Sequence, residues 1–171
     1  MKLNVGASVV RGEYKEREWI NIDIERVRGV NIKGSGLALP FKDDSFEEIH
    51  CVHVLEHVTR DKSSPMLGEM YRVLKPSCYA YIEVPNFQGT MNNLMNAFDK
   101  NDIRQIHIWT TSVYGKSERE GMAHHWGFYP KLLSNRMEEV GFKSVEELKR
   151  KEEMISPHYK QEPIILMRGR K

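Results

Sequence analysis

Residues 35–57, SGLALPFKDDSFEEIHCVHVLEH, decide the fold of this chain. The acidic segment 42–45 is rich in Asp and Ser, whose short side chains bond their own backbone in turns. The apolar run 46–52 that follows it has the length of a strand buried in a sheet. Residues 53–57, HVLEH, then place three titratable side chains just beyond the carboxyl end of that strand, where ligands bind in open α/β sheets.

Three short motifs in this stretch occur in a characteristic order. They are Leu39-Pro40-Phe41, the turn from Asp43 to Phe46, and His53-Val54-Leu55-Glu56-His57. In order and spacing they resemble the small "methyltransferase type 11" branch of the class I S-adenosylmethionine-dependent methyltransferases. The segments 72–76 (RVLKP) and 84–87 (VPNF), with a strand-like run between them, resemble the same branch.

The rest of the chain predicts an α/β protein in which strands alternate with crossovers. We expect strands at Leu3–Val5, Trp19–Asp23, Val30–Ile32, Phe46–Val52, Tyr79–Val84, Lys143–Leu148 and Pro163–Met167. One helix is expected to start with Ser64 as N-cap and Pro65 at its first position, and another to start at Pro130 and stop at Gly141. The resemblance implies a Rossmann-like, mainly parallel sheet with an antiparallel terminal strand. Residues 9–18 are too short and polar for the usual first helix, so that region is shortened.

The ends of the first two strands carry the expected cofactor site. Gly6 ends the first strand, and Asp23 ends the second, where an acid suits the hydroxyls of a bound ribose. A plain turn at Gly6 and a turn-capping role for Asp23 are the alternatives. The resemblance implies S-adenosylmethionine as cofactor, bound by residues spread over four segments: Gly6, Ala7, Ser8, Asp23, Ser35, Gly36, Leu37, Leu39 and His53.

Two of these positions depart from the family pattern. Gly6-Ala7-Ser8 replaces the usual G-x-G, and Ser35 stands where the family has an acid for the adenine amino group. The dinucleotide fingerprint G-x-G-x-x-G is also missing, which argues against a dehydrogenase.

His53 is the candidate catalytic residue, because it follows the fourth strand and histidine titrates near neutral pH. It would act either as a general base or as a residue that fixes the loop by hydrogen bonding. Glu56 and His57 are expected to start a helix.

Residues 88–128 form an insert that we expect to cover the acceptor, with Trp109, His124 and Trp126 facing it. The spacing of four apolar residues predicts one helical stripe: Met91, Leu94, Met95 and Phe98. Residues 106–109 and 112–115 are each expected to form one turn. The competing interpretation is that the insert packs on the sheet as core.

Composition limits the other possibilities. The 171 residues predict a single domain over 1–171, and a net charge of +2 gives no basic surface for nucleic acid. The sequence contains no apolar run long enough to span a membrane and no signal peptide, so we expect a cytoplasmic protein. We considered His107, His124 and His125 as zinc ligands, but adjacent histidines rarely bind one ion, so we expect no metal site. The sequence does not indicate an oligomeric state.

The resemblance implies methyl transfer to an acceptor. The residues after the fourth strand differ from those of nucleic-acid amino-methyltransferases, which favours a small-molecule, sugar or lipid-linked acceptor instead. The alternative is a non-catalytic binding module of the same fold, with its cofactor loop eroded at Ser8 and Ser35.

Overall fold

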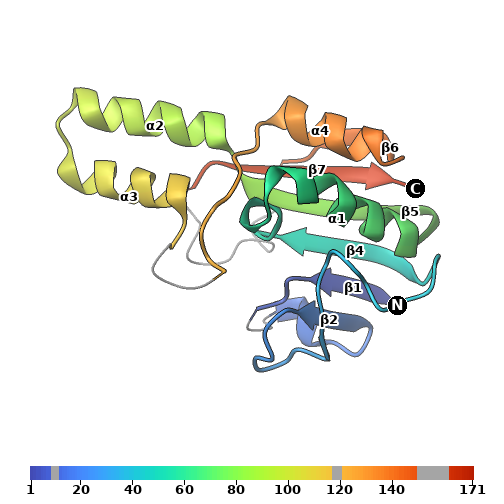
Figure 1. Ribbon diagram of the computed structural model, residues 1–171. Coiled ribbons are helices and arrows are strands. Elements are labelled where there is room, and N and C mark those ends of the chain that lie inside the picture. The colour runs from blue at the N-terminus through green and yellow to red at the C-terminus, as the bar shows by residue number, and fades with distance from the viewer. Residues whose placement is uncertain (9–11, 117–120, 150–161) are drawn as a thin grey trace.

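Seven strands form one sheet in the order β3-β2-β1-β4-β5-β7-β6 (Figure 1). The computed structural model describes residues 1–8, 12–116, 121–149 and 162–171. The strand bounds are β1 Lys2–Val5, β2 Trp19–Asp23, β3 Ile32–Lys33, β4 Phe46–Val52, β5 Leu74–Pro85, β6 Lys143–Glu147 and β7 Ile164–Arg170. All neighbouring pairs are parallel except β5–β7 and β6–β7, which are antiparallel. The predicted mainly parallel sheet with an antiparallel terminal strand is confirmed.

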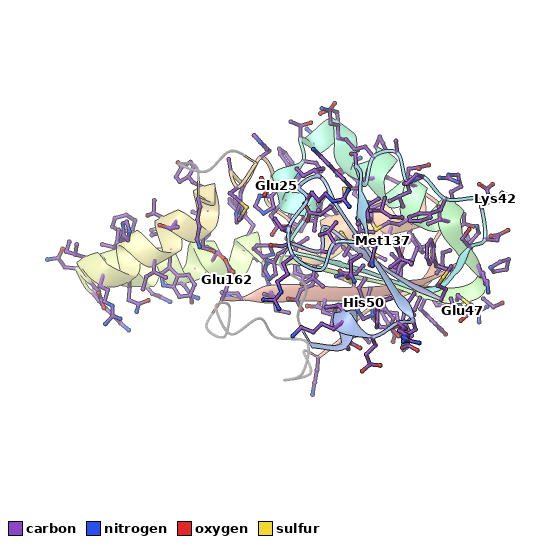
Figure 2. The ribbon with its side chains drawn as sticks, turned by 90° about the horizontal axis from the view of Figure 1, so that it is seen from below. Glu25, Lys42, Glu47, His50, Met137 and Glu162 are labelled. Carbon is purple, nitrogen blue, oxygen red and sulfur yellow. The ribbon has the colours of Figure 1, made fainter. Side chains whose placement is uncertain are left out.

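The two faces of the sheet differ because successive side chains along a strand point to opposite sides. One face is apolar and packs under the helices α1 Arg60–Val73 and α4 Pro130–Glu139. It includes Leu3, Val5, Ile22, Ile49, Cys51, Ile82, Val84, Ile165 and Met167. The alternate positions carry Asn4, Asn21, His50 and Glu83, and Tyr14 of the short 3-10 helix η1 Gly12–Lys15 contacts Trp19 and His50 there. Figure 2 shows the side chains, with His50 of the polar face and Met137 of the core labelled.

Helix α1 begins earlier than the sequence indicates. Its N-cap is Thr59, and Pro65 lies inside the helix rather than at its start. The buried face of the helix extends back to Ser63. The Ser63 hydroxyl donates to the Arg60 carbonyl oxygen (2.9 Å). Pro65 is exposed and is the sixth residue of the helix, so α1 lacks the backbone hydrogen bond that another residue would donate to the Asp61 carbonyl oxygen. Ser64, predicted as the N-cap, instead accepts a hydrogen bond from Arg136 of α4 (3.0 Å).

The first half of the insert is a helical hairpin formed by α2 Phe87–Asp99 and α3 Ile103–Tyr114. It extends beyond the carboxyl ends of β1 and β4 (Figure 1). The two turns predicted at 106–109 and 112–115 are therefore one helix, which Asp102 caps by accepting from the Gln105 amide (3.0 Å). The predicted apolar stripe on α2 is helical but does not form core: Met95 and Phe98 are more than half exposed.

The carboxyl-terminal part agrees with the sequence prediction. Helix α4 starts at Pro130, and Gly141 follows its C-cap with φ +117°, a conformation that favours glycine. Strands β6 and β7 then form the expected antiparallel pair, the last two strands in the order of the sheet. Among the described residues, no helix combines the length and the apolar character needed to cross a bilayer.

Candidate active site

The carboxyl ends of β1, β2, β4 and β5 meet at one edge of the sheet, as parallel strands require. This edge brings Gly6, Asp23 and His53 together at three neighbouring strand ends, which are in register through Val5↔Ile22 and Val5↔Cys51. The carboxyl end of β5 is followed by Asn86, which caps α2 by accepting from the Gly89 amide (3.1 Å). The sequence prediction of where the site lies is thus consistent with the fold.

Gly6 has a backbone role that no other residue could fill. Its φ is +71°, and its amide and that of Ala7 both donate to the Ile22 carbonyl oxygen (2.9 and 3.1 Å). A Cβ at this position would overlap the side chain of Val54, the second residue of HVLEH. Gly6 therefore joins the loop after β1 to the loop after β4, and the missing second glycine does not remove this tight turn.

Asp23 ties two loops together. One carboxylate oxygen accepts from the Ser8 amide and the other from the Glu25 amide, both at 2.8 Å. The turn-capping alternative is therefore observed. Each carboxylate oxygen offers more than one acceptor site, so the partly exposed group still has acceptor capacity for a ligand's hydroxyls. The ribose role remains a prediction.

The predicted adenine loop, residues 35–39, is fixed by hydrogen bonds to the ion pair of Arg72 and Glu69 on α1. Arg72 donates to the carbonyl oxygens of Leu39 (3.0 Å) and Phe41 (2.8 Å), while Glu69 accepts from the Leu39 amide (2.7 Å). Ser35 accepts from the Leu37 amide (3.2 Å), so its hydroxyl oxygen shapes the turn. These contacts fix the backbone on which the remaining cofactor positions lie.

Two positions of the adenine loop serve the core. Leu39 is only 4% exposed, and its side chain packs in the core rather than facing the edge. Gly36 has no room for a Cβ, because Met66 and Val5 lie against it. Ser35 and Leu37 are the partly exposed side chains of the predicted set in this loop.

His53 lies between two buried carboxylates. Its Nδ1 is 3.1 Å from Glu56 Oε1, and its Nε2 is 3.2 Å from Glu83 Oε1. The side chains of Glu56 and Glu83 are 2% and 1% exposed, and that of His53 is 9% exposed. Its backbone has φ +53°, a left-handed conformation that is uncommon for a non-glycine residue, and its amide donates to the Glu83 carbonyl oxygen (2.9 Å). Such local strain is often found at functional sites.

The charges around His53 favour its protonated form. Burial alone would lower the pKa of His53, but the contacts with Glu56 and Glu83 outweigh burial and raise its pKa well above the usual value. Burial would likewise raise the pKa of Glu56, yet its bond to His53 lowers it. An imidazolium held by two carboxylates is a poor proton acceptor. The arrangement therefore supports the positioning role for His53 over the general-base role.

The three predicted acceptor residues do not form one group. The amides of His125 and Trp126 donate to the Glu56 carbonyl oxygen (2.8 and 3.4 Å), which brings the segment 124–126 against HVLEH. His124 is 4.9 Å from His57 between ring centroids, and Trp126 lies under the Arg60 guanidinium (5.1 Å). Trp109 is buried in α3, outside the main core cluster. His107 and His125 are exposed.

Sequence reasoning missed Glu83. The acid is the second partner of His53 and belongs to β5, thirty residues further along the chain. A detectable signal exists in the sequence: an acid interrupts an otherwise apolar strand, and a buried carboxylate needs a partner. The sequence could not identify that partner, because it lies on a neighbouring strand.

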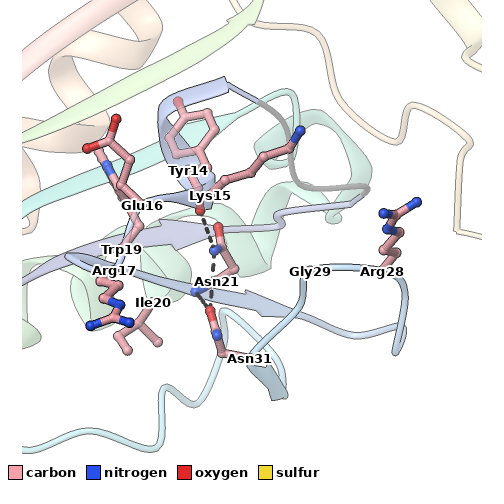
Figure 3. Close-up of a pocket in the computed structure, with 10 residues that line it drawn as sticks. All are labelled: Tyr14, Lys15, Glu16, Arg17, Trp19, Ile20, Asn21, Arg28, Gly29 and Asn31. Carbon is pink, nitrogen blue, oxygen red and sulfur yellow. Dashed lines mark hydrogen bonds between the residues drawn. The ribbon is translucent and has the colours of Figure 1, made fainter.

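A surface cavity of about 690 Å³ lies away from this edge (Figure 3). It is bordered by η1, by the first half of β2 and by residues 28–31. Within it the side-chain nitrogen of Asn21 donates to the Tyr14 carbonyl oxygen (2.8 Å). The backbone N–H of Asn21 donates to Asn31 Oδ1 (2.8 Å). None of the predicted site residues lines this cavity. We place the candidate site at the strand ends, because the ionisable and strained residues gather there.

Residues 6–82 match the model of a family described as "Methyltransferase domain". No match is found among curated proteins.

Several solved structures share the fold over 99% of the chain. A SAM-dependent methyltransferase of Archaeoglobus fulgidus is 18% identical and is covered over 85% of its length, with a TM-score of 0.63. A SAM-dependent methyltransferase of Thermotoga maritima, described as a possible histamine N-methyltransferase, is 22% identical and covered over 81% of its length, with a TM-score of 0.59.

A third structure contains ligands. It is the 1,6-didemethyltoxoflavin-N1-methyltransferase of Burkholderia thailandensis with 1,6-didemethyltoxoflavin and S-adenosylhomocysteine bound, 13% identical, covered over 70%, with a TM-score of 0.58. Residues 6–82 thus match the methyltransferase-domain family model, and the chain has the fold of the class I S-adenosylmethionine-dependent methyltransferases.

Proposed function

We propose that the protein transfers a methyl group from S-adenosylmethionine to a small-molecule acceptor, with sugars and lipid-linked molecules inside that class. The observation that carries the proposal is the arrangement of Gly6 and Asp23 at the ends of β1 and β2, inside the segment that matches the family. Two of these neighbours are named for small-molecule acceptors, one of them as a possible histamine N-methyltransferase, and this supports the same class here.

The cofactor would lie across the ends of β1 and β2. In this arrangement Gly6, Ala7 and Ser8 pass under its methionine part, Asp23 accepts from the ribose hydroxyls, and Ser35, Gly36 and Leu37 border the adenine. Leu39 would support the adenine loop from the core. The methyl group carried by the sulfonium then needs mainly an aligned acceptor and exclusion of water.

His53 would position the loop between the cofactor and the acceptor. It lies at the end of β4, next to the strand that carries Gly6, and is fixed by Glu56 and Glu83 on both ring nitrogens. Its left-handed backbone directs Val54 against Gly6. Through these contacts one residue links the cofactor loop to the buried acids.

The insert would cover the acceptor. Helix α2 starts directly after β5, so the hairpin of α2 and α3 begins at the edge where the methyl group would lie. The segment 122–126 returns to that edge through its hydrogen bonds to Glu56 and Tyr114. In this proposal His124 and Trp126 face the acceptor directly, while Trp109 stabilises the hairpin from inside.

The test is a turnover assay with methyl-labelled S-adenosylmethionine and pools of small amines, phenols, sugars and lipid extracts. Methyl transfer is expected as release of S-adenosylhomocysteine together with a labelled product in at least one pool. Cofactor binding without product in any pool would mean that the acceptor lies outside these pools. Absence of cofactor binding, measured by titration with S-adenosylhomocysteine, would contradict the proposal and favour the non-catalytic binding module with its eroded cofactor loop.

A further inference from the structure

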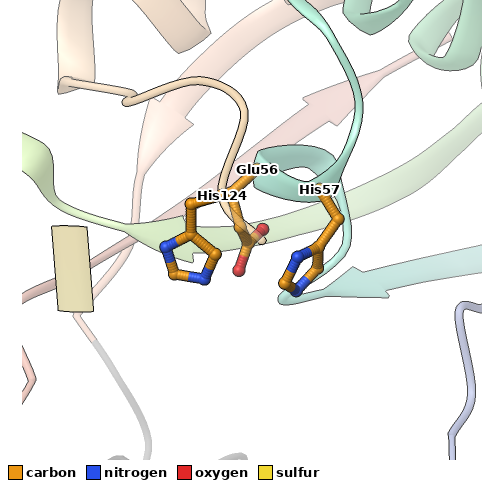
Figure 4. A group of neighbouring side chains, drawn as sticks. All are labelled: Glu56, His57 and His124. Carbon is orange, nitrogen blue, oxygen red and sulfur yellow. The ribbon is translucent and has the colours of Figure 1, made fainter. Parts of the chain in front are cut away.

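A group of three metal-binding side chains lies beside the proposed acceptor position. Glu56, His57 and His124 each offer one ligand atom, and these atoms all lie within 4.8 Å of one another. Figure 4 shows the Glu56 carboxylate between the two imidazole rings. We propose that Glu56, His57 and His124 bind a divalent transition-metal ion of the zinc class.

Both imidazoles are already oriented as metal ligands. Nδ1 of His57 lies 3.0 Å from the Ala123 carbonyl oxygen, and Nδ1 of His124 lies 2.9 Å from the Ser112 carbonyl oxygen. A carbonyl oxygen can only accept, so both Nδ1 atoms carry a proton, and in the neutral form of each ring Nε2 carries the lone pair. Histidines that bind metals are held in this way, with the other ring N–H donated to a carbonyl or carboxylate.

Glu56 supplies an independent indication of a ligand. Its side chain is 2% exposed, and Oε1 contacts His53. Among the described residues, Oε2 has no hydrogen-bond partner although it is buried. A buried carboxylate oxygen without a partner is costly, and a bound cation would satisfy it. The carboxylate can therefore serve His53 with one oxygen and the metal with the other.

The backbone brings the three ligands together from two distant segments. Glu56 and His57 belong to the 3-10 helix η2 Leu55–His57, directly after β4. His124 follows α3, and its amide donates to the Tyr114 carbonyl oxygen (2.9 Å). Gly115 makes room for it, since a Cβ there would lie 2.8 Å from His124 Cδ2. The ligand positions are thus set by the fold.

The ligand set indicates the class of metal and its role. Two imidazoles and one carboxylate are a set found in catalytic zinc sites, where a fourth position stays open for water or substrate. An ion here would lie next to His53 and could bind an oxygen or nitrogen atom of the acceptor. This role rests on the proposed function, whereas metal binding itself does not.

The experiment measures metal without any cofactor. Untagged protein is stripped with a chelator, dialysed against Zn²⁺ and analysed by elemental mass spectrometry; Co²⁺ binding is followed by its visible absorption. We expect one equivalent of Zn²⁺ and a Co²⁺ spectrum typical of a low-coordinate site. His57→Ala and His124→Ala should each weaken binding by more than about tenfold. His107→Ala and His125→Ala remove exposed imidazoles outside the group and should change nothing.

The outcome is decisive because folding is monitored in the same samples. Circular dichroism should show that the alanine variants are folded, and His124→Gln provides a second variant if His124→Ala is not. Absence of bound Zn²⁺ in the wild type, or unchanged binding by folded His124 variants, would overturn the metal site. Titration with S-adenosylhomocysteine in chelator tests the proposed function separately, so the two proposals can fail independently.

Discussion

The carboxyl edge of the sheet has two halves with different construction. The half at β1 and β2 consists of a glycine turn, backbone amides and one partly exposed acid, Asp23. The half at β4 and β5 consists of His53 and the two buried acidic side chains that contact it. A site of the first kind can change its ligand contacts at little cost to the fold. A site of the second kind is part of the fold, so substitutions of its residues should mainly lower the free energy of unfolding.

The largest effect is expected for His53→Ala. Removing the imidazolium leaves Glu56 and Glu83 buried without their common partner, and breaking a buried ion pair costs about 3–5 kcal/mol of unfolding free energy. Urea unfolding in the presence of chelator measures it. Adding Glu83→Gln to His53→Ala removes one of the two buried carboxylates and should recover part of the loss. A loss below about 1 kcal/mol would mean that the two halves do not differ in this way.

Gly6→Ala tests the contact between the two halves, which is formed by Gly6 and Val54. The left-handed backbone costs roughly 1–2 kcal/mol for alanine, and the overlap with Val54 adds about 1–3 kcal/mol. Gly12→Ala is the matched control: Gly12 also has positive φ, but its Cβ would meet no described atom within 4 Å. Thermal or urea unfolding should therefore show a clearly larger loss at Gly6. Equal losses at both glycines would exclude the contact with Val54 as a constraint.

Asp23→Ala should act on affinity more than on stability. Loss of charge-assisted hydrogen bonds to a ribose should weaken S-adenosylhomocysteine binding by about 1.5–3 kcal/mol each. The bonds to the Ser8 and Glu25 amides are exposed, so water can replace the lost acceptor, and the stability loss should be only about 1 kcal/mol. Calorimetric titration and urea unfolding give the two values. Glu25→Ala, which removes the next acid, serves as control. Unchanged affinity in Asp23→Ala would remove the ribose assignment.

The smallest effect is expected at Ser35. Aspartate there would restore the acid that the resembled family uses toward adenine, and it can still accept from the Leu37 amide as the serine does. Replacing a neutral acceptor by a charged one should strengthen cofactor binding by about 0.5–1.5 kcal/mol. Ser35→Ala should weaken it slightly. If Ser35→Asp bound the cofactor more weakly than the wild type, the adenine would not lie at this loop.

The same two halves explain what could be predicted from the sequence. Gly6, Asp23 and the strand pattern are local signals, because a glycine, an acid and period-two alternation each occupy a few consecutive residues. Strands β2 and β4 consequently have the predicted bounds. The partners of His53 and His124 depend on which strands and loops become neighbours, so Glu83 and the approach of His124 to Glu56 were not predictable.

The helices show a second limit of local signals. Pro65 suggested a helix start, but α1 begins at Arg60, and Ser63 is already buried before Pro65. The competing interpretation placed the apolar stripe of α2 on the sheet as core, but α2 pairs with α3 beyond the sheet and leaves Met95 and Phe98 exposed. In both cases tertiary packing overrides the pattern in the sequence.

Calorimetric titration of the wild-type protein with S-adenosylhomocysteine tests the central claim most directly, because it needs no knowledge of the acceptor. We predict saturable binding of one equivalent, with a melting temperature that rises with ligand concentration; at a hundredfold excess over Kd the folded state gains about 2.7 kcal/mol. No heat and no shift in melting temperature at millimolar ligand would contradict a cofactor site at the ends of β1 and β2.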